Sequence, residues 1–426
     1  MARYFFDAHM HAMNLNHPDF VSLVDSIASG FSEFVVSGAL SPGYLLTPAN
    51  RSQQGLVTIL NMFSVFERSI AQMFELIEDD LCGNILHPEE EHKGKRLANI
   101  MYPDLPYIRD GAFHFRNQRY DYYALVPLVM DFSRASNEWG KAYYAQRRWE
   151  KIIAYLDDTI KAIHQYYELR PTGLLRFFPF LGINSEAHET AFIEELLDTY
   201  IRTDRSASDR IPNSTDRRLF WGVKLYPPLG TDPWPADDTK KLEKIETIYR
   251  FCSIHKIPIT THCDDQGFRG VTAKLAQQYT SPASWKPVLA KYPDLYIDFA
   301  HYGKQYNPLA KPPLKALLDN TITNDPWFGQ IIEFMSTYEH VYADVSFTGT
   351  DPLFYQQLYE YLEKLDDEYV RERILTRSMF GSDFSVNLSK VESYANYLRI
   401  FETSPFPDET IERFAYSNPV DFLGIN

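Results

Sequence analysis

Two histidines near the N-terminus, His9 and His11, are two residues apart in an apolar segment. A β-strand turns every second side chain to the same face, so both imidazoles could chelate one metal ion. With 12 histidines in 426 positions, chance supplies roughly 0.3 such pairs, which makes a short motif weak evidence when it stands alone. The prediction of a metal site at this pair therefore needs further candidate ligands elsewhere in the sequence.

Four more residues suited to metal binding or acid–base chemistry lie at or just past the ends of later apolar runs. They are Lys224 in GVKLYPP, His262 in ITTHC, His301 in DFAHYG and Asp383 in FGSDF. If the runs are parallel strands of one barrel, these ends converge on a single mouth. Histidine and carboxylate are the ligands of catalytic zinc, which keeps one position open for water. His188 lacks this placement and is expected to be structural, near a helix N-terminus.

The elements that must position these residues are eight short apolar runs. They cover residues 3–9, 122–131, 174–182, 220–227, 257–263, 295–301, 341–346 and 378–384. Their continuous hydrophobicity is typical of parallel strands covered on both faces. Helical periodicity separates most of them, as in residues 189–202 and 238–256, and no GxGxxG motif follows the first run. The pattern predicts an α/β fold, a (β/α)8 TIM barrel formed by residues 1–426 as a single domain.

The connection between the first two runs is anomalously long. About 110 residues separate His11 from Tyr122, which predicts a mostly helical insertion at about residues 35–118. It contains a predicted helix at residues 56–81 and a polar loop at residues 87–96. An insertion after the first strand lies on the catalytic face of a barrel, so we expect it to roof the pocket. A second long helix is predicted at residues 137–167.

The composition indicates which classes of binding partner and which cellular compartment to expect. A net charge of −15 disfavours nucleic acid and anionic membranes, both of which need a basic footprint, so a small-molecule substrate is expected. An odd count of three cysteines indicates a reducing compartment rather than a disulfide framework. The N-terminal residues show no basic region followed by a long apolar run, and no 18 uncharged apolar residues occur together, so a cytoplasmic protein is expected. The sequence leaves a homo-oligomer open.

The ordered motifs DAHMH, GVKLYPP, THC, AHYG and GSD resemble the amidohydrolase superfamily, and most of all the branch often called amidohydrolase-2. The resemblance runs from Asp7 to the closing NPVDFLGIN, apart from the insertion. It implies that a divalent metal ion, with Zn²⁺ expected, is bound by the set His9, His11, His262 and Asp383.

The resemblance leaves the roles of His301 and Lys224 open. In one-metal relatives the residue matching His301 acts as acid or base or orients substrate, and in two-metal relatives it binds the second ion. A carbamylated Lys224 would bridge two metals, whereas an unmodified Lys224 would pair with a carboxylate or bind substrate. Since one-metal relatives also have a lysine here, carbamylation is not implied.

The ligand set suggests a mechanism. A bound divalent ion lowers the pKa of its water from about 15.7 toward about 7. Asp383 would accept the water's proton and return it to the leaving group, while His301 or Lys224 would polarise the scissile carbonyl or stabilise the oxyanion. The residues just beyond the motifs are expected to contact substrate, namely Tyr226, Asp264, Arg269 and Tyr302.

The leading hypothesis is therefore a metal-dependent hydrolase that cleaves a C–N or C–O bond in a small polar amide, ester or lactone. The main alternative is a nonoxidative decarboxylase of the same branch. It would use one metal, His301 as proton donor or base, and Arg269 or Lys224 as a clamp for the carboxylate. A third hypothesis is a noncatalytic metal-binding barrel, against which the complete ligand set argues.

Overall fold

The computed structural model describes residues 2–14, 16–17, 62, 64–84, 105–133, 148–205, 216–265, 267–305 and 327–425. Every predicted run contains a strand. The strands are β1 (Tyr4–Met10), β5 (Tyr122–Pro127), β6 (Leu175–Phe177), β7 (Phe180–Gly182), β8 (Gly222–Leu225), β9 (Ile259–Thr261), β10 (Ile297–Phe299), β11 (Val341–Asp344) and β12 (Ser378–Met379). They pair in parallel and are almost entirely buried. The predicted α/β class is confirmed.

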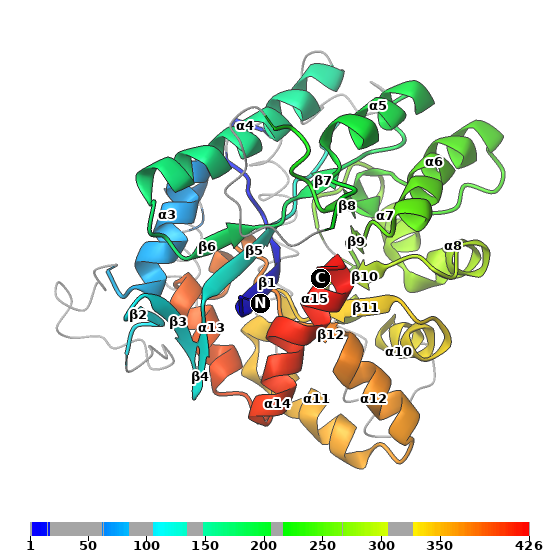
Figure 1. The fold of residues 1–426 in the computed structure, drawn as a ribbon. Helices are drawn as coiled ribbons and strands as arrows, with labels where there is room; N and C mark the ends of the chain where they lie inside the picture. Colours follow the sequence, from blue (N-terminus) through cyan, green and yellow to red (C-terminus); the bar gives the residue numbers. More distant parts are fainter. Residues whose placement is uncertain are drawn as a thin grey trace, which may run out of the picture.

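Helices surround these strands (Figure 1). They are α4 (Arg148–Leu169), α5 (Thr190–Tyr200), α6 (Thr239–His255), α7 (Ala273–Thr280), α8 (Lys286–Lys291), α10 (Trp327–Thr337), α11 (Pro352–Lys364), α12 (Glu368–Arg377), α13 (Tyr394–Glu402), α14 (Asp408–Glu412) and α15 (Asn418–Leu423). Of the helix predicted at residues 137–167, the described part is α4, which continues to Leu169. Within the described part of the chain, no helix is both long and apolar enough to cross a membrane.

The strands do not form one continuous barrel. They form a sheet of order β1-β5-β6 and a second of order β12-β11-β10-β9-β8-β7. The predicted strand at residues 174–182 is split into β6 and β7 around Pro179, which has no N–H with which to continue a ladder. Single bridges span the two gaps, Leu128 with Phe180 and Met10 with Phe384. The strands therefore follow the predicted order and run parallel, as expected for a barrel. Their pairing is not continuous, so the predicted closed eight-stranded barrel is not formed.

The described part of the insertion is not purely helical. It holds α3 (Ile70–Leu81) and an antiparallel sheet of β2 (Ile108–Arg109), β3 (Ala112–Phe115) and β4 (Gln118–Tyr120). The helix predicted at residues 56–81 is interrupted: residues 62 and 64–66 are helical, and α3 begins at Ile70 after Ser69, which caps it with a reciprocal capping box to Gln72. α3 packs against α4 and α13, at the side of the strands. Residues 18–61 and 85–104, including the predicted polar loop, lie outside the described residues.

Candidate metal centre

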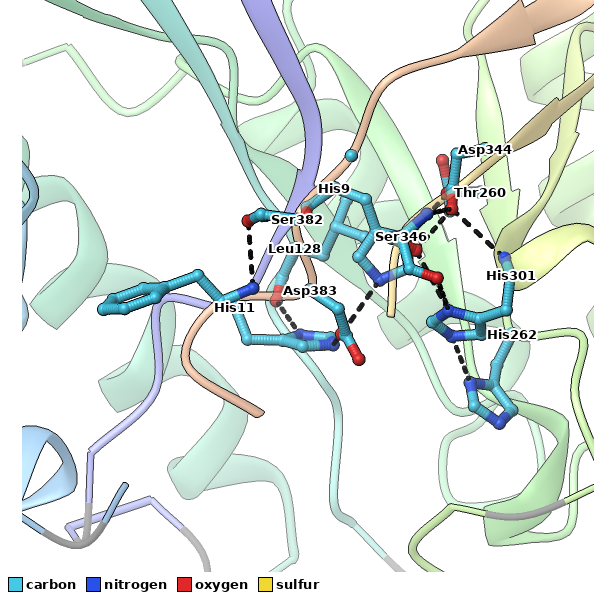
Figure 2. A network of polar contacts seen from close by, with 12 residues as sticks. His9, His11, Leu128, Thr260, His262, His301, Asp344, Ser346, Ser382 and Asp383 are labelled. Carbon is cyan, nitrogen blue, oxygen red and sulfur yellow. Dashed lines mark hydrogen bonds and ion pairs between the residues drawn. The ribbon is translucent and has the colours of Figure 1, made fainter. Parts of the chain in front are cut away.

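The strand ends bring most of the predicted residues together. Figure 2 shows Asp383, which follows β12, beside His9 of β1 and His11 just after it, with His301 and His262 on the other side of His9. The Asp383 Oδ1 atom lies 3.1 Å from His11 Nε2 and 3.5 Å from His9 Nε2. The His9 and His301 ring centroids are 5.0 Å apart, and those of His301 and His262 are 4.9 Å apart.

His9 is held by a residue that the sequence interpretation passed over. Its Nδ1 lies 2.7 Å from Asp344 Oδ2 and 3.2 Å from the Ser346 hydroxyl, while its Nε2 makes no hydrogen bond although the ring is completely buried. Burial lowers the pKa of His9 to about 3, even though Asp344 acts to raise it. A neutral imidazole that donates from Nδ1 offers a lone pair at Nε2, which is the form that binds metal.

His11 and His301 are oriented in the same way, by backbone carbonyls. His11 Nδ1 lies 3.2 Å from the Leu128 oxygen, so donation from Nδ1 leaves the Nε2 lone pair toward Asp383. His301 Nδ1 lies 3.0 Å from the Ser346 carbonyl oxygen, and its Nε2 faces His262 Nδ1 at 3.2 Å. Three imidazoles thus present one nitrogen each to a common region.

His301 and Tyr302 lie in one turn, which directs their side chains differently. His301 and Tyr302 both have left-handed backbone conformations, with φ of 62° and 55°, which non-glycine residues rarely adopt. The turn aims His301 at the other histidines, whereas the buried Tyr302 hydroxyl bonds to Ser378 at the start of β12. The Tyr302 hydroxyl is thus engaged by Ser378, and the substrate contact expected at Tyr302 stays a prediction.

The other predicted substrate residues lie in the loops after β8 and β9. The Tyr226 ring packs on His262 with centroids 4.6 Å apart, and its hydroxyl accepts a hydrogen bond from the Phe268 N–H. Asp264 Oδ1 lies 3.0 Å from His262 Nε2. Arg269 donates to the Asp265 carbonyl oxygen at 3.2 Å. Tyr226 and Asp264 therefore border the histidines, and Arg269 supports its own loop.

Lys224 lies in the interior among acids. Its Nζ is buried and has no hydrogen-bond partner. Burial lowers its pKa to about 8, although Asp344 and Asp298 act to raise it. Asp298, on β10, is also fully buried; burial and the neighbouring Asp344 hold its pKa well above the ordinary value, while Thr260 donates to it at 3.1 Å.

The donors fit a divalent ion. Ligand atoms of His9, His301 and Asp383 lie within 4.8 Å of one another, and so do those of the set His262, Asp264 and His301. All of these residues are buried, and the unbonded His9 Nε2 is an orphan that a metal would satisfy. A further set, formed by His9, Asp298 and Asp344, meets the same criterion.

Sequence reasoning missed Asp344, Ser346 and Asp298. Asp344 is the last residue of β11, within the run VYADVS, so a search for carboxylates and histidines near strand ends would have found it. Ser346 acts through its carbonyl and hydroxyl, and no residue-type pattern marks that role. Asp298 lies in the middle of a strand rather than at its end. The sequence does not indicate which groups a carboxylate at such a position faces.

Comparison with known proteins identifies one family. The model of the family described as Amidohydrolase matches residues 166–425. This range includes Lys224, His262, His301 and Asp383 but not the DAHMH segment. No curated protein matches the chain.

Solved structures give only distant likenesses. A dihydroxybenzoic acid decarboxylase from Polaromonas sp. with bound manganese has 10% identity and a TM-score of 0.46, with 100% of this chain and 97% of that chain covered. A probable 2-pyrone-4,6-dicarboxylic acid hydrolase from Acinetobacter baumannii has 14% identity and a TM-score of 0.42, with coverage of 72% and 84%. The 5-carboxyvanillate decarboxylase LigW from Sphingomonas paucimobilis has 12% identity and a TM-score of 0.40, with coverage of 72% and 79%. These values are too low for any of the three activities to transfer to this chain.

Proposed function

Because this chain belongs to the amidohydrolase family of enzymes, we propose that it is a metal-dependent hydrolase that cleaves a C–N or C–O bond in a small polar amide, ester or lactone. The observation that carries the proposal is the buried set of His9, His301 and Asp383, whose ligand atoms lie within 4.8 Å of one another. A set of imidazole and carboxylate with an unbonded nitrogen is suited to a catalytic divalent ion.

The proposed ligands are His9, His11, His262 and Asp383, and Zn²⁺ is the proposed ion because imidazole and carboxylate suit it. A bound divalent ion supplies two things, polarisation of a carbonyl and a lower pKa for water. The protein contributes the orientation of each donor. Asp344 fixes His9, and the Leu128 carbonyl fixes His11, so that little reorganisation is needed when the ion binds.

Asp383 and His301 are the proposed proton carriers. The Asp383 Oδ1 atom faces the imidazoles of His9 and His11, so Oδ2 is the atom that we assign to hold the proton of the attacking water. His301 is held at Nδ1 by Ser346, so its Nε2 can accept a proton or, once protonated, donate one to the leaving group. Both groups lie within the same buried cluster.

We propose that Lys224 remains an unmodified lysine and that the centre holds one metal. Its amine is buried beside Asp344 and Asp298, and an ammonium there balances their charge. A carbamate would instead add a negative charge to the same group of carboxylates. Tyr226 and Asp264, next to His262, remain the proposed substrate contacts.

A nonoxidative decarboxylase is the second candidate. The observation that favours it is His301, whose supported Nδ1 and inward Nε2 suit proton transfer to carbon as well as to a leaving group. The carboxylate clamp that this reaction needs is less well supported. Lys224 faces acids, and Arg269 bonds to its own loop, so the hydrolase is placed first.

The first experiment measures metal per chain by elemental analysis of protein purified without chelator. Wild type, Asp383→Ala and Lys224→Ala are compared. We expect about one equivalent in wild type, its loss in Asp383→Ala and its retention in Lys224→Ala. Two equivalents, one of them dependent on Lys224, would replace the one-metal proposal by a carbamate-bridged centre. No metal after reconstitution would reject the mechanism and favour a noncatalytic barrel.

A second experiment separates the two reactions. The metal-loaded protein is incubated in ¹⁸O-labelled water with panels of amides, esters, lactones and aromatic or enoic acids. Incorporation of the label into a carboxylic acid product supports the hydrolase. Release of CO₂ without label in the organic product supports the decarboxylase.

A further inference from the structure

Asp7 is a buried carboxylate that lies two residues before His9 and outside every group of metal donors described above. It accepts four hydrogen bonds. The Ser382 N–H donates at 2.8 Å, the Ser382 hydroxyl at 2.5 Å, the Tyr394 hydroxyl at 2.5 Å and the His9 N–H at 3.2 Å. One carboxylate therefore contacts two separate segments of the chain. It binds the backbone N–H of His9, and it binds Ser382, the residue directly before Asp383.

These contacts lie where the sheet is interrupted. We call the seam the place where residues 7–11 meet residues 380–384. On its other side β1 has a register shift relative to β5 between Asp7 and Met10, and among the described residues the β-bridge pairing across the seam is the single bridge between Met10 and Phe384. Backbone hydrogen bonds nevertheless cross the seam, from the Ala8 N–H to the Phe380 carbonyl oxygen and from the His11 N–H to the Phe384 carbonyl oxygen. Side-chain contacts add to these bonds in holding the two segments together.

The seam joins the backbones of the proposed ligands directly. The N–H groups of Ser382 and Asp383 both donate to the His9 carbonyl oxygen, at 3.0 and 2.7 Å. Gly381 permits this approach, because a Cβ atom there would lie 2.8 Å from His9 Cβ. Asp383 itself has a left-handed backbone with φ of 58°, a conformation that persists only where its surroundings hold it.

Asp7 is in turn anchored from outside the seam. The Tyr394 hydroxyl, on α13, contacts the Tyr123 hydroxyl of β5 at 2.8 Å. The carboxylate thus connects β1, the residues after β12, and a helix packed beside them. Its two oxygens are both used, Oδ1 by backbone N–H groups and Oδ2 by hydroxyls.

We propose that Asp7 is a positioning residue, the latch of the seam, which sets the separation of His9 from Asp383 and thereby the geometry of the metal site. The proposal rests on the proposed metal-dependent function. Outer groups that orient metal ligands typically change metal affinity by about 10- to 100-fold when they are removed. Because Asp7 touches no donor atom, its effect must pass through the backbone of His9 and through Ser382.

The test compares metal binding by Asp7→Asn and wild type. The amide keeps the size of the side chain but replaces one acceptor oxygen by a donor, so one group of the latch must lose its partner. We expect Zn²⁺ affinity, measured by competition with a chelating dye, to fall by about 10- to 100-fold. We also expect the visible absorption bands of the Co²⁺-substituted protein to change, since they report coordination geometry and a merely structural role would not move them.

Ser382→Ala is the milder second variant. It removes one hydroxyl donor to Asp7, retains the Ser382 N–H, and also removes an acceptor for the Phe384 N–H. Tyr249→Phe is the matched control, because it removes a buried tyrosine hydroxyl that donates to the Pro233 carbonyl oxygen, away from the seam. We expect Ser382→Ala to weaken Zn²⁺ binding and alter the Co²⁺ spectrum in the same direction as Asp7→Asn, and Tyr249→Phe to change neither.

The outcomes separate the latch from the function on which it rests. Unchanged Zn²⁺ affinity and Co²⁺ spectrum in folded Asp7→Asn would overturn the latch, as would the same result in Ser382→Ala if Asp7→Asn fails to fold. In either case the wild-type metal site would stand. A wild-type protein that binds neither ion would overturn the metal-dependent function itself, and the latch with it.

Discussion

Among the buried imidazole–carboxylate pairs of the described residues, two differ in use, His9 with Asp344 and His188 with Asp131. His9 Nδ1 lies 2.7 Å from Asp344, and His188 Nε2 lies 2.6 Å from Asp131. All four side chains are almost fully buried, and each carboxylate lies at or shortly after the C-terminal end of a strand. Judged by the pair alone, both could orient a catalytic or metal-binding histidine.

The surroundings separate them. The second nitrogen of His9 makes no hydrogen bond and lies with Asp383 and His301 in a group of donors. His188 belongs to none of the groups of three or more metal-type donors among the described residues.

The oxygens of Asp131 also serve a different purpose. They accept from the Ser133 N–H at 3.0 Å and the Asn184 N–H at 3.0 Å. Asn184 is bonded in turn by Thr231. One pair therefore orients a ligand, while the other fastens the loops after β5, β7 and β8. The groups that surround such a pair, rather than the pair alone, thus decide its role.

The largest expected effect is that of His9→Ala. Removal of a proposed ligand whose Nε2 faces the other donors should abolish metal retention and lower kcat/KM by on the order of 10³-fold or more. Elemental analysis and assays of the metal-loaded protein measure this. If the variant keeps its metal and its activity, His9 is not a metal ligand. The two pairs would then not differ in metal binding.

His188→Ala should act on stability instead. It leaves the carboxylate of Asp131 buried without its imidazole, which should cost about 3 kcal/mol in the free energy of unfolding. Chemical denaturation measures the cost, and metal content should equal that of wild type. Loss of metal in a folded variant would show that the loops fastened by His188 are part of the metal site.

Asp344→Asn should weaken the metal site without destroying it. The amide can no longer accept a charge-assisted hydrogen bond from His9 Nδ1 as the carboxylate does, so Zn²⁺ affinity should fall by about 10- to 100-fold. Dye competition measures the affinity, and Asp131→Asn is the matched control at the other pair. Equal Zn²⁺ affinities in wild type and both variants would mean that Asp344 supports metal binding no more than Asp131 does.

The smallest expected effect is a difference in acid stability. Burial acts to raise the pKa of Asp131, but the charge and hydrogen bond of His188 and further donors outweigh it, so the pKa lies below its ordinary value of 3.8. A carboxyl whose pKa is lower in the folded state stabilises the protein above its unfolded pKa, and this stabilisation is lost as the pH falls through the folded pKa.

Wild type should therefore lose Tm more steeply than Asp131→Asn as the pH falls from 6 through about 4 and below. Thermal unfolding of both proteins over this range, without metal, provides the test. Parallel Tm curves would mean that Asp131 has no lowered pKa and that the His188 pair contributes little to folding.

Much of the site could be predicted from sequence because its residues follow a rule that is local along the chain. His262, His301 and Asp383 each come just after an apolar run, and such runs become parallel strands whose ends share one edge. The same local argument did not foresee that the Tyr302 hydroxyl contacts Ser378. Proximity in sequence says nothing about a left-handed turn that sends adjacent side chains in different directions.

The fold was predictable to a similar degree. Hydrophobic runs and helical periods predicted the α/β order correctly, because burial on both faces leaves a continuous apolar signature. The division of the run at residues 174–182 around Pro179 could be suspected from that proline alone. The antiparallel sheet of β2, β3 and β4 was not foreseen within an insertion expected to be mostly helical, since short strands carry weak periodicity.

The sequence by itself determined the residue types available for chemistry, their placement at strand ends and the family to which the chain belongs. Tertiary structure alone decided which residues act together. That Asp344 holds His9, that Asp7 fastens His9 to Ser382, and that Lys224 lies among carboxylates all depend on contacts between residues far apart in sequence. A pattern along one strand records which face a side chain occupies, but the partner it meets is set by the other strands of the fold.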